Sequence, residues 1–346
     1  AAAPAAPVHQ AAGCGMSELT PDLLRELVAE ARLAPSVHNI QPTRWRLLGD
    51  GRLALVDDTG VRAPVADPAG HDVLVSHGAA LEGMSLALNR RGLAITAMTT
   101  IEQPLSPQYA LLCSFAIRQG VAPDPLAGHV AHRMSWRGKF TKSADDPAPL
   151  VQLAVARDDS ICICHRQTIT EIAGWADQAE FSFIHGDDYR AELLGWMRLS
   201  PGHPHYQLDG LNRDVLAMNA VEATAARFVL GSLFRPLDRL GLAASLLADR
   251  AKTASASAIV LFCRPVGEDP LTTGRHFYRS WLEIDRAGLA ACPISALADH
   301  PDFNERLRKL GKVGADLRLV NVFRVGRPEK LLNPRHYRMP VDRLIV

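Results

Sequence analysis

The sequence of 346 residues lacks several features that would narrow its function at once. Its formal net charge is only +1, from 38 Lys and Arg against 37 Asp and Glu, so it has no basic excess for general nucleic-acid binding. The longest apolar run, near 258–263, is far too short to span a bilayer. Its six cysteines show no disulfide-scaffold spacing. We therefore expect a soluble globular protein with a small-molecule partner, no nucleic acid and no membrane span.

Several widespread functional motifs are also missing. The sequence has no Gly-x-Gly-x-x-Gly run after a strand, no P-loop, no His-Glu-x-x-His pair and no nucleophile elbow. A nicotinamide would therefore not sit in a Rossmann domain. The His203–His205 pair supplies too few ligands for a tetrahedral site, and the alternation of Cys162, Ile163 and Cys164 is typical of a buried strand. We predict no metal.

The first 16 residues are rich in Ala and carry Pro4 and Pro7, but they lack a charged region followed by an apolar one. We expect a flexible leader over residues 1–16. The predicted location is the cytoplasm, and the alternative is export to the periplasm after cleavage of a signal before Ala1.

The segment after this leader predicts a helix and a hairpin. Thr20 and Pro21 form a good helix start, and apolar residues then recur at helical spacing as far as Ala34. Two apolar runs, Trp45–Leu48 and Arg52–Val56, flank a Gly-Asp-Gly turn and predict a β-hairpin.

An order of elements seen early in the chain returns late in it. A helix over 73–91, apolar on most sides, follows Asp67-Pro68, and a second helix follows Asp269-Pro270. Their ends share the pattern Arg-x-Gly-Leu-Ala from Arg90 and from Arg286, an offset of 286 − 90 = 196 residues. A duplicated unit that cannot bury its own apolar face is expected to pair with its copy.

Short polar side chains cluster where the first helix ends. Ser36, Asn39 and Gln41 lie between Pro35 and Pro42, and their hydroxyl and amide groups suit the uracil-like edge of a flavin ring, which both donates and accepts hydrogen bonds. The alternative interpretation is a helix exit followed by an ordinary polar turn.

The motif Ala-Pro-Ser-x-x-Asn-x-Gln-Pro at 34–42 resembles the flavin-contacting motif of the nitroreductase family of FMN-dependent oxidoreductases. With His38 before Asn39, it looks most similar to the Acg-like branch. The resemblance implies that Ser36, His38, Asn39 and Gln41 contact FMN.

A second cluster, Arg133-x-Ser135-x-Arg137, offers two guanidinium groups and a hydroxyl on one side of an extended segment. Guanidinium groups match phosphate oxygens bidentately, although a solvated basic turn is the alternative. The cluster also resembles the family's phosphate clamp for FMN. By the same resemblance, Arg338 near the carboxyl end is expected to reach that phosphate.

Ordinary nitroreductases are homodimers in which each subunit carries both motifs, whereas here the loop and the clamp fall in different halves. The resemblance therefore implies an α+β, nitroreductase-like fold of two fused halves, each with a mixed, mainly antiparallel sheet flanked by helices. We expect a pseudo-dimer in one chain with one flavin site, as a monomer or a weak homodimer. The expected halves are residues 17–130 and 131–346, with a lid insert at about 180–250.

Further site residues follow from the resemblance alone. His71 stands where the family commonly has Arg, so it is expected to replace part of that contact to the flavin. Pro293, Ile294 and Ser295 correspond to the segment whose backbone N–H approaches flavin N5, while the alternative is a buried strand start. His38 or a water is a possible proton source, and no residue is required as general acid or base.

The preferred function is an FMN-dependent oxidoreductase that uses NAD(P)H to reduce a small aromatic or conjugated acceptor. A first alternative is an FMN storage or sequestration protein whose lid prevents turnover. A second resembles the relatives that fragment flavin to dimethylbenzimidazole, and a third is an interaction protein without flavin.

Overall fold

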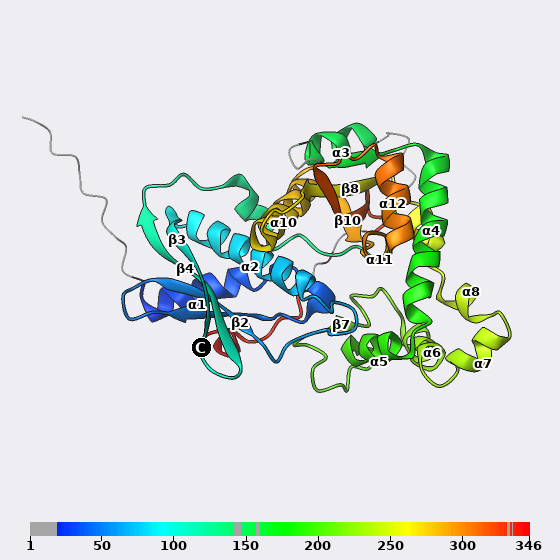
Figure 1. Ribbon diagram of the computed structural model, residues 1–346, viewed down its shortest axis with the longest axis horizontal. Helices are drawn as coiled ribbons and strands as arrows, with labels where there is room; N and C mark the ends of the chain where they lie inside the picture. Colours follow the sequence, from blue (N-terminus) through cyan, green and yellow to red (C-terminus); the bar gives the residue numbers. More distant parts are fainter. Residues whose placement is uncertain (1–18, 142–146, 157–159, 331–332, 334) are drawn as a thin grey trace, which may run out of the picture.

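The computed structural model describes residues 19–141, 147–156, 160–330, 333 and 335–346. The expected leader at 1–16, with Cys14, lies outside the described residues. The chain folds as an α+β protein with two four-stranded antiparallel sheets, each flanked by helices (Figure 1). This agrees with the fold class expected from the sequence.

The first sheet is built from strands on both sides of a long helix. The strands β1 (Thr43–Leu47) and β2 (Leu53–Asp58) form the predicted hairpin, and α2 (His71–Asn89) follows. The chain returns through β3 (Leu93–Pro104) and β4 (Tyr109–Gln119), which gives the strand order β1-β2-β4-β3.

The second sheet repeats this arrangement. Its elements are β5 (Ile161–Ile163), β8 (Ala258–Pro265), α10 (Pro270–Arg286), β9 (Ala290–Pro293) and β10 (Leu317–Gly326), and its strand order is β5-β8-β10-β9. Both sheets thus read strand, strand, helix, strand, strand along the chain, and both place the last strand inside the sheet.

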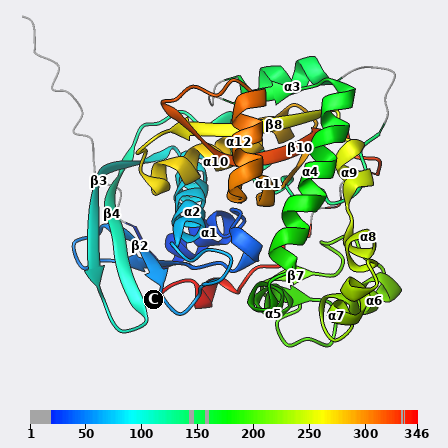
Figure 2. The same ribbon diagram turned by 45° about the vertical axis from the view of Figure 1, so that its right-hand side comes forward.

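One long segment interrupts the second arrangement between β5 and β8. It begins with α4 (Arg166–Ile184), which packs on the second sheet's side of the molecule, and α5 to α8 lie apart from both sheets (Figure 2). The remaining elements of this segment are α5 (Asp187–Trp196), β6 (Met197–Arg198), β7 (Leu211–Asn212), α6 (Ala220–Leu230), α7 (Phe234–Arg239), α8 (Ala243–Leu247) and α9 (Arg250–Ala254).

The other elements are short or lie on the outside of the sheets. They are α1 (Pro21–Ala31), α3 (Ala148–Val155), α11 (Ala296–Asp299), α12 (Pro301–Leu310) and the 3-10 helices η1 (Val37–Asn39), η2 (Pro125–His129) and η3 (Val341–Arg343). No helix among the described residues has both the length and the apolar character needed to cross a membrane.

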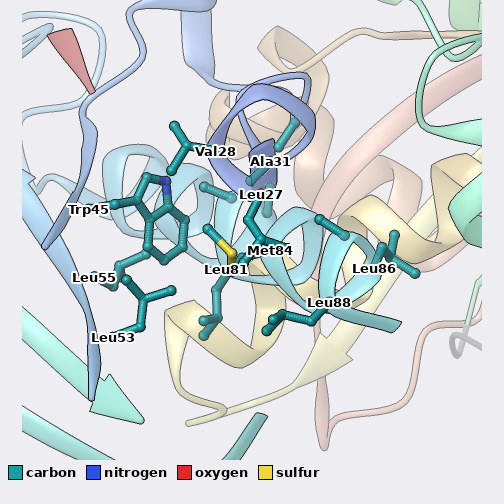
Figure 3. Packing of buried hydrophobic residues seen from close by; sticks show 14 of the residues in the cluster. Leu27, Val28, Ala31, Trp45, Leu53, Leu55, Leu81, Met84, Leu86 and Leu88 are labelled. Carbon is teal, nitrogen blue, oxygen red and sulfur yellow. The ribbon is translucent and has the colours of Figure 1, made fainter. Parts of the chain in front are cut away.

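The first helix forms for the reasons that its sequence indicates. The Thr20 hydroxyl accepts a hydrogen bond from the backbone N–H of Leu23 at 3.2 Å, and Pro21 occupies the first turn. Its apolar face, with Leu27 fully buried, packs against Trp45 of β1 and Met84 of α2 (Figure 3). The helix ends at Ala31 rather than Ala34, because Leu33 and Ala34 continue into tighter turns.

The helices α2 and α10 cross at two glycines at the centre of the molecule. A Cβ on Gly78 would lie 2.1 Å from the Leu271 carbonyl oxygen, and a Cβ on Gly274 would lie 2.0 Å from the Val75 carbonyl oxygen. The contact is reciprocal, and both pairs of equivalent residues are separated by the offset of the sequence repeat, since 274 − 78 = 196 and 271 − 75 = 196. A two-fold relation between the helices has this property.

The carboxyl-terminal tail returns to the first half. Trp45 donates its backbone N–H to the Leu344 carbonyl at 2.8 Å, and Trp45 and Ile345 form a parallel bridge. Ser135 forms a parallel bridge with Ala291 at the edge of the second sheet. Each antiparallel sheet therefore has one parallel bridge at its edge. The tail before Met339 passes the end of α1, where Arg338 donates to the Arg32 carbonyl.

One local expectation needs correction. The Cys162 to Cys164 segment was expected to be a buried strand, yet β5 is a three-residue edge strand whose residues are only partly buried. It pairs only with β8, so its other edge has no neighbouring strand within the described part of the chain.

Candidate active site

A cavity of about 450 Å³ is lined by residues of α2, of β9 and β10 and of the inserted segment, together with loops between them. Its wall includes the polar loop after α1, the segment around Arg133, the end of β9 and the tail before Met339. Ten of the twelve site residues expected from the sequence lie in this wall: Ser36, His38, Asn39, Arg133, Ser135, Arg137, Pro293, Ile294, Ser295 and Arg338. Stretches of sequence up to 300 residues apart therefore meet at one site.

The polar loop has an unusual backbone. Three residues that are not glycine adopt left-handed conformations within four positions, with φ of 43° at His38, 57° at Asn39 and 56° at Gln41. Such conformations cost about 1–3 kcal/mol each and persist where the surroundings hold them. Here the Ser36 hydroxyl accepts from the Gln41 N–H at 3.0 Å, and the Ser76 hydroxyl accepts from the Val37 N–H at 3.1 Å.

Two asparagines in the cavity wall have side-chain atoms without a partner. The Asn39 amide nitrogen donates to the carbonyls of Gly210 at 3.2 Å and Tyr337 at 3.0 Å, while its Oδ1 is buried and unpaired. Asn212 is fully buried, and neither its Nδ2 nor its Oδ1 has a partner among the described residues. Since a buried polar group without a hydrogen bond is costly, both side chains favour a polar ligand in the cavity.

Two of the arginines meet at the end of α1. Arg133 and Arg338 each donate an Nη2 hydrogen to the Leu33 carbonyl, at 3.2 and 3.3 Å, and Arg338 also binds the Arg32 and Ala34 carbonyls. The carboxyl end of a helix favours nearby positive charge. The Arg133 guanidinium also lies 4.4 Å from the centre of the Trp281 ring.

Three of the expected arginines, Arg133, Arg137 and Arg338, lie in the cavity wall. Among the described residues no carboxylate forms an ion pair with Arg133, Arg137 or Arg338, although Arg335 nearby pairs with Asp214 at 2.6 Å. Burial lowers the pKa of Arg133, and burial together with the charge of Arg133 lowers the pKa of Arg338 to about 9. The three guanidinium groups therefore form a cationic end of the cavity that a bound anion would neutralise.

Two expected site residues lie elsewhere. Gln41 is not in the cavity wall, because its amide is used in the scaffold: Nε2 donates to the Leu208 carbonyl at 2.8 Å and Oε1 accepts from the Met339 N–H at 2.9 Å. His71 also lies outside the wall and hydrogen-bonds Arg318 at 3.0 Å. In this structure, neither side chain contributes to the surface of the cavity.

The other expected residues reach the wall from the second half. Ser135 is held at the sheet margin by its bridge to Ala291. Pro293 to Ser295 follow β9 directly, but the Ile294 N–H is already donated to the Val322 carbonyl at 2.7 Å. Burial, followed by the charge of Arg137, lowers the pKa of His38, so its imidazole is neutral near pH 7.

Sequence reasoning missed the acidic residues of the wall, which are Asp72, Asp177, Glu180 and Asp249. Burial, followed by the charges of Asp249 and Asp177, raises the pKa of Glu180 to about 7. Burial and the charge of Asp67 raise the pKa of Asp72 to about 6. The chain encloses Glu180, yet solvent reaches it through the cavity. Its place on α4, inside the inserted segment, has no motif that would have revealed it.

Comparisons with known proteins give structural similarity only. No protein-family model and no curated protein match this sequence. Among solved structures, the chain is similar to the FMN- and NADPH-dependent nitroreductase NfnB from sphigopyxis sp. strain HMH, at 16% identity over 64% of this chain and 98% of that chain, with a TM-score of 0.35. It is also similar to oxidized iodotyrosine deiodinase bound to FMN and 3-iodo-L-tyrosine, at 14% identity over 61% and 95%, with a TM-score of 0.36.

A third similar structure is a nitroreductase with bound FMN from Bacteroides fragilis NCTC 9343, at 13% identity over 62% of this chain and 94% of that chain, with a TM-score of 0.35. Similarity at this level establishes neither a family nor an activity for the chain. The residues of the cavity therefore carry the functional assignment.

Proposed function

We propose that the chain binds FMN in this cavity and acts as an FMN-dependent oxidoreductase that uses NAD(P)H to reduce a small aromatic or conjugated acceptor. The observation that carries the proposal is the group of three guanidinium side chains, Arg133, Arg137 and Arg338, without an acidic partner among the described residues. Burial lowers the pKa of both Arg133 and Arg338, so a bound anion would stabilise their charged forms.

The remaining polar groups of the wall fit the rest of FMN. Arg133, Arg137, Arg338 and Ser135 would hold the phosphate, for which guanidinium groups are suited. The unpaired Oδ1 of Asn39 can accept a hydrogen bond from a ring N–H, and the unpaired amide of Asn212 can both donate and accept. The motif resemblance at 34–42 and 133–137 supports the same assignment.

When bound, FMN would supply the hydride and electron-transfer chemistry that amino-acid side chains lack. The chain's own part is to bind, orient and enclose. The strained loop at 38–41 fixes Asn39, and the inserted segment supplies part of the wall around the ligand. With a pKa of about 7, Glu180 is protonated in a substantial fraction of molecules near neutral pH, which makes it a better proton donor to an acceptor than the neutral His38. Asp72, with a pKa of about 6, is mostly ionised there.

Purified protein tests the proposal directly. We expect a flavin absorption spectrum with one FMN per chain, bleaching of that spectrum on anaerobic addition of NADPH or NADH, and steady turnover with a nitroaromatic or a quinone. Colourless protein that also fails to bind added FMN would overturn the proposal.

A second function is favoured by the way the inserted segment is attached. Asn39 and Gln41 hydrogen-bond to the segment at Gly210 and Leu208, and the same segment supplies part of the cavity wall. A cavity closed in this way suits storage of FMN with little turnover. Bound, chemically reducible flavin without NAD(P)H oxidation would favour storage over catalysis.

We also infer that residues 17–130 and 131–346 are two copies of one unit, with the insert at about 180–250 as a lid on the second. The equal strand orders and the reciprocal contact of Gly78 with Gly274 support this inference. A pseudo-dimer of this kind needs no second chain, so we expect a monomer or at most a weak homodimer. Sedimentation at several protein concentrations tests that expectation.

A further inference from the structure

Three metal-binding side chains meet outside the cavity. His129 ends η2, His132 lies on the following turn, and Asp285 lies on the last turn of α10. One ligand atom of each lies within 4.8 Å of the others. His129 Nδ1 and Asp285 Oδ2 are 2.9 Å apart, and His132 is exposed. None of the three belongs to the cavity wall, so the function proposed above gives these side chains no role of their own.

We propose that His129, His132 and Asp285 form a binding site for one divalent transition-metal ion. Two imidazoles and one carboxylate are a ligand set for Fe²⁺, Ni²⁺, Cu²⁺ and Zn²⁺. The exposed His132 has solvent around its ring, so it can turn toward the ion without unpacking the core. Water would occupy the remaining coordination positions.

The ligand set indicates which ions the site suits. His129 Nδ1 and Asp285 Oδ2 are joined by a hydrogen bond of 2.9 Å, and a metal ion would take the place of the shared proton. Among divalent first-row ions the affinity of such nitrogen and oxygen ligands rises to Cu²⁺ and falls again at Zn²⁺, so the site should bind Cu²⁺ most tightly.

An ion bound at this cluster would also affect the position of Arg133. Arg133 and His132 both donate their backbone N–H to the His129 carbonyl, at 3.0 and 3.1 Å, so the turn that holds two of the ligands also places Arg133. Asp285 lies one helical turn after Trp281, over which the Arg133 guanidinium stacks. A bound ion would link this turn to α10 and fix the backbone of Arg133.

Titration calorimetry of untagged, chelator-treated protein with Ni²⁺ and with Cu²⁺ tests the site. We expect saturable binding near one equivalent, affinity lowered by about tenfold or more in both His132→Gln and Asp285→Asn, and Cu²⁺ spin-resonance spectra with two nitrogen ligands in the wild type and one in His132→Gln. His132 is exposed and Asn retains the hydrogen-bonding shape of Asp285, so both variants should fold, which circular dichroism checks.

His185→Gln is the matched control, because His185 Nε2 lies 3.0 Å from Asp238 Oδ2 on the surface in a similar His–Asp pair. This variant should bind the ions as the wild type does. The proposal is wrong if the wild type shows no saturable binding, if His132→Gln binds unchanged, or if His185→Gln loses as much affinity. None of these outcomes depends on FMN, so the test stands apart from that of the proposed function.

Discussion

Asn39 and Gly210 are joined by two hydrogen bonds in the wall of the cavity. The Asn39 amide nitrogen donates to the Gly210 carbonyl, and the Gly210 N–H donates to the Asn39 carbonyl, both at 3.2 Å. One partner belongs to the loop of left-handed residues and the other to the inserted segment. Asn39, which we propose to contact the flavin, therefore also binds the inserted segment that we propose as a lid.

Gly210→Ala should weaken the attachment of the inserted segment to Asn39. Gly210 has φ of 70°, and a Cβ there would lie 2.4 Å from the Trp196 carbonyl oxygen, so the backbone must move. We expect FMN to dissociate from the variant at least several-fold faster, and trypsin to cut the 198–219 region sooner. Stopped-flow dilution and timed proteolysis measure the two effects.

Gly241→Ala is the control for Gly210→Ala. Gly241 has a similar φ of 68° in the same inserted segment, but a Cβ there meets nothing within 4 Å. It carries the conformational strain without the steric conflict at the fastening point. Equal FMN dissociation rates in the two variants would show that strain in the segment, and not the contact with Asn39, controls release.

Arg137→Gln should weaken FMN binding with little effect on folding. Arg137 makes only one long hydrogen bond within the described residues, 3.5 Å to the Val215 carbonyl, whereas Arg133 and Arg338 also hold the end of α1. Loss of one charge-assisted hydrogen bond costs about 1.5–3 kcal/mol, which corresponds to about a tenfold to hundredfold rise in Kd. Fluorescence titration of apoprotein with FMN measures it.

Arg335→Gln serves as the control for charge alone. Arg335 also lies in the cavity wall, but it pairs with Asp214 at 2.6 Å. We expect its substitution to change the Kd for FMN less than threefold, about 0.65 kcal/mol. If Arg335→Gln weakened binding as much as Arg137→Gln, the cationic end would act through its total charge and not as a phosphate clamp.

Gly78→Ala and Gly274→Ala should each destabilise the protein severely. Either methyl group would approach a carbonyl oxygen of the opposite helix to about 2 Å, and both helices would have to separate. We expect a loss of at least about 3 kcal/mol for each variant, in the range of severe overpacking. The double variant should lose less than the sum, because the first methyl already separates the helices. Urea unfolding measures all three.

Gly195→Ala should instead raise the free energy of unfolding in the same assay. Gly195 lies on α5, and a Cβ there meets nothing within 4 Å. Alanine at an exposed helix position is better than glycine by about 0.5–1 kcal/mol. A destabilised Gly195→Ala would mean that helix propensity and the space around the added methyl do not decide these effects.

The buried His77 predicts a pH dependence of stability. Its imidazole is fully buried between the Thr43 hydroxyl at 2.8 Å and the Asp57 carboxylate at 3.0 Å, and burial lowers its pKa below 6.5. Below pH 6.5 the His77 imidazole binds a proton in the unfolded chain but stays neutral in the folded chain, because its folded pKa is lower. The free energy of unfolding therefore falls as the pH decreases.

His77→Gln should make this dependence shallower between pH 7.5 and pH 5.5, by at most about 1.4 kcal/mol per pH unit for one proton. The variant should also be less stable at pH 7.5, since the Gln amide cannot reproduce both hydrogen bonds. His185→Gln, at an exposed histidine, should leave the slope unchanged. Urea unfolding at several pH values tests this, and an unaltered slope in His77→Gln would contradict it.

The sequence predicts the fold where local signals are strong. Thr20 and Pro21 mark the start of α1, the Gly-Asp-Gly turn marks the first hairpin, and Gly92 follows α2 in the left-handed conformation that ends helices. The repeat offset of 196 residues also predicts the pairing of α2 with α10, because it brings Gly78 opposite Gly274.

The sequence could not predict the parts of the site that depend on tertiary contacts. Gln41 belongs to the same motif as Asn39, but the left-handed backbone turns its amide to Leu208 and Met339 and away from the cavity. Glu180 and Asn212 enter the wall only because the inserted segment folds over it. A local sequence pattern cannot reveal that a residue lies in the cavity wall when distant parts of the chain form that wall.

The inserted segment interrupts only one of the two sheets, although their strand orders match. In the second sheet it separates β5 from β8, whereas the corresponding link in the first sheet, between β1 and β2, is the short exposed turn around Asp50. Lengthening a surface loop costs little entropy. That turn is therefore a suitable place to insert a reporter or a fused domain. The β1–β2 connection would then be long, like the β5–β8 connection, and the cavity wall would be unchanged.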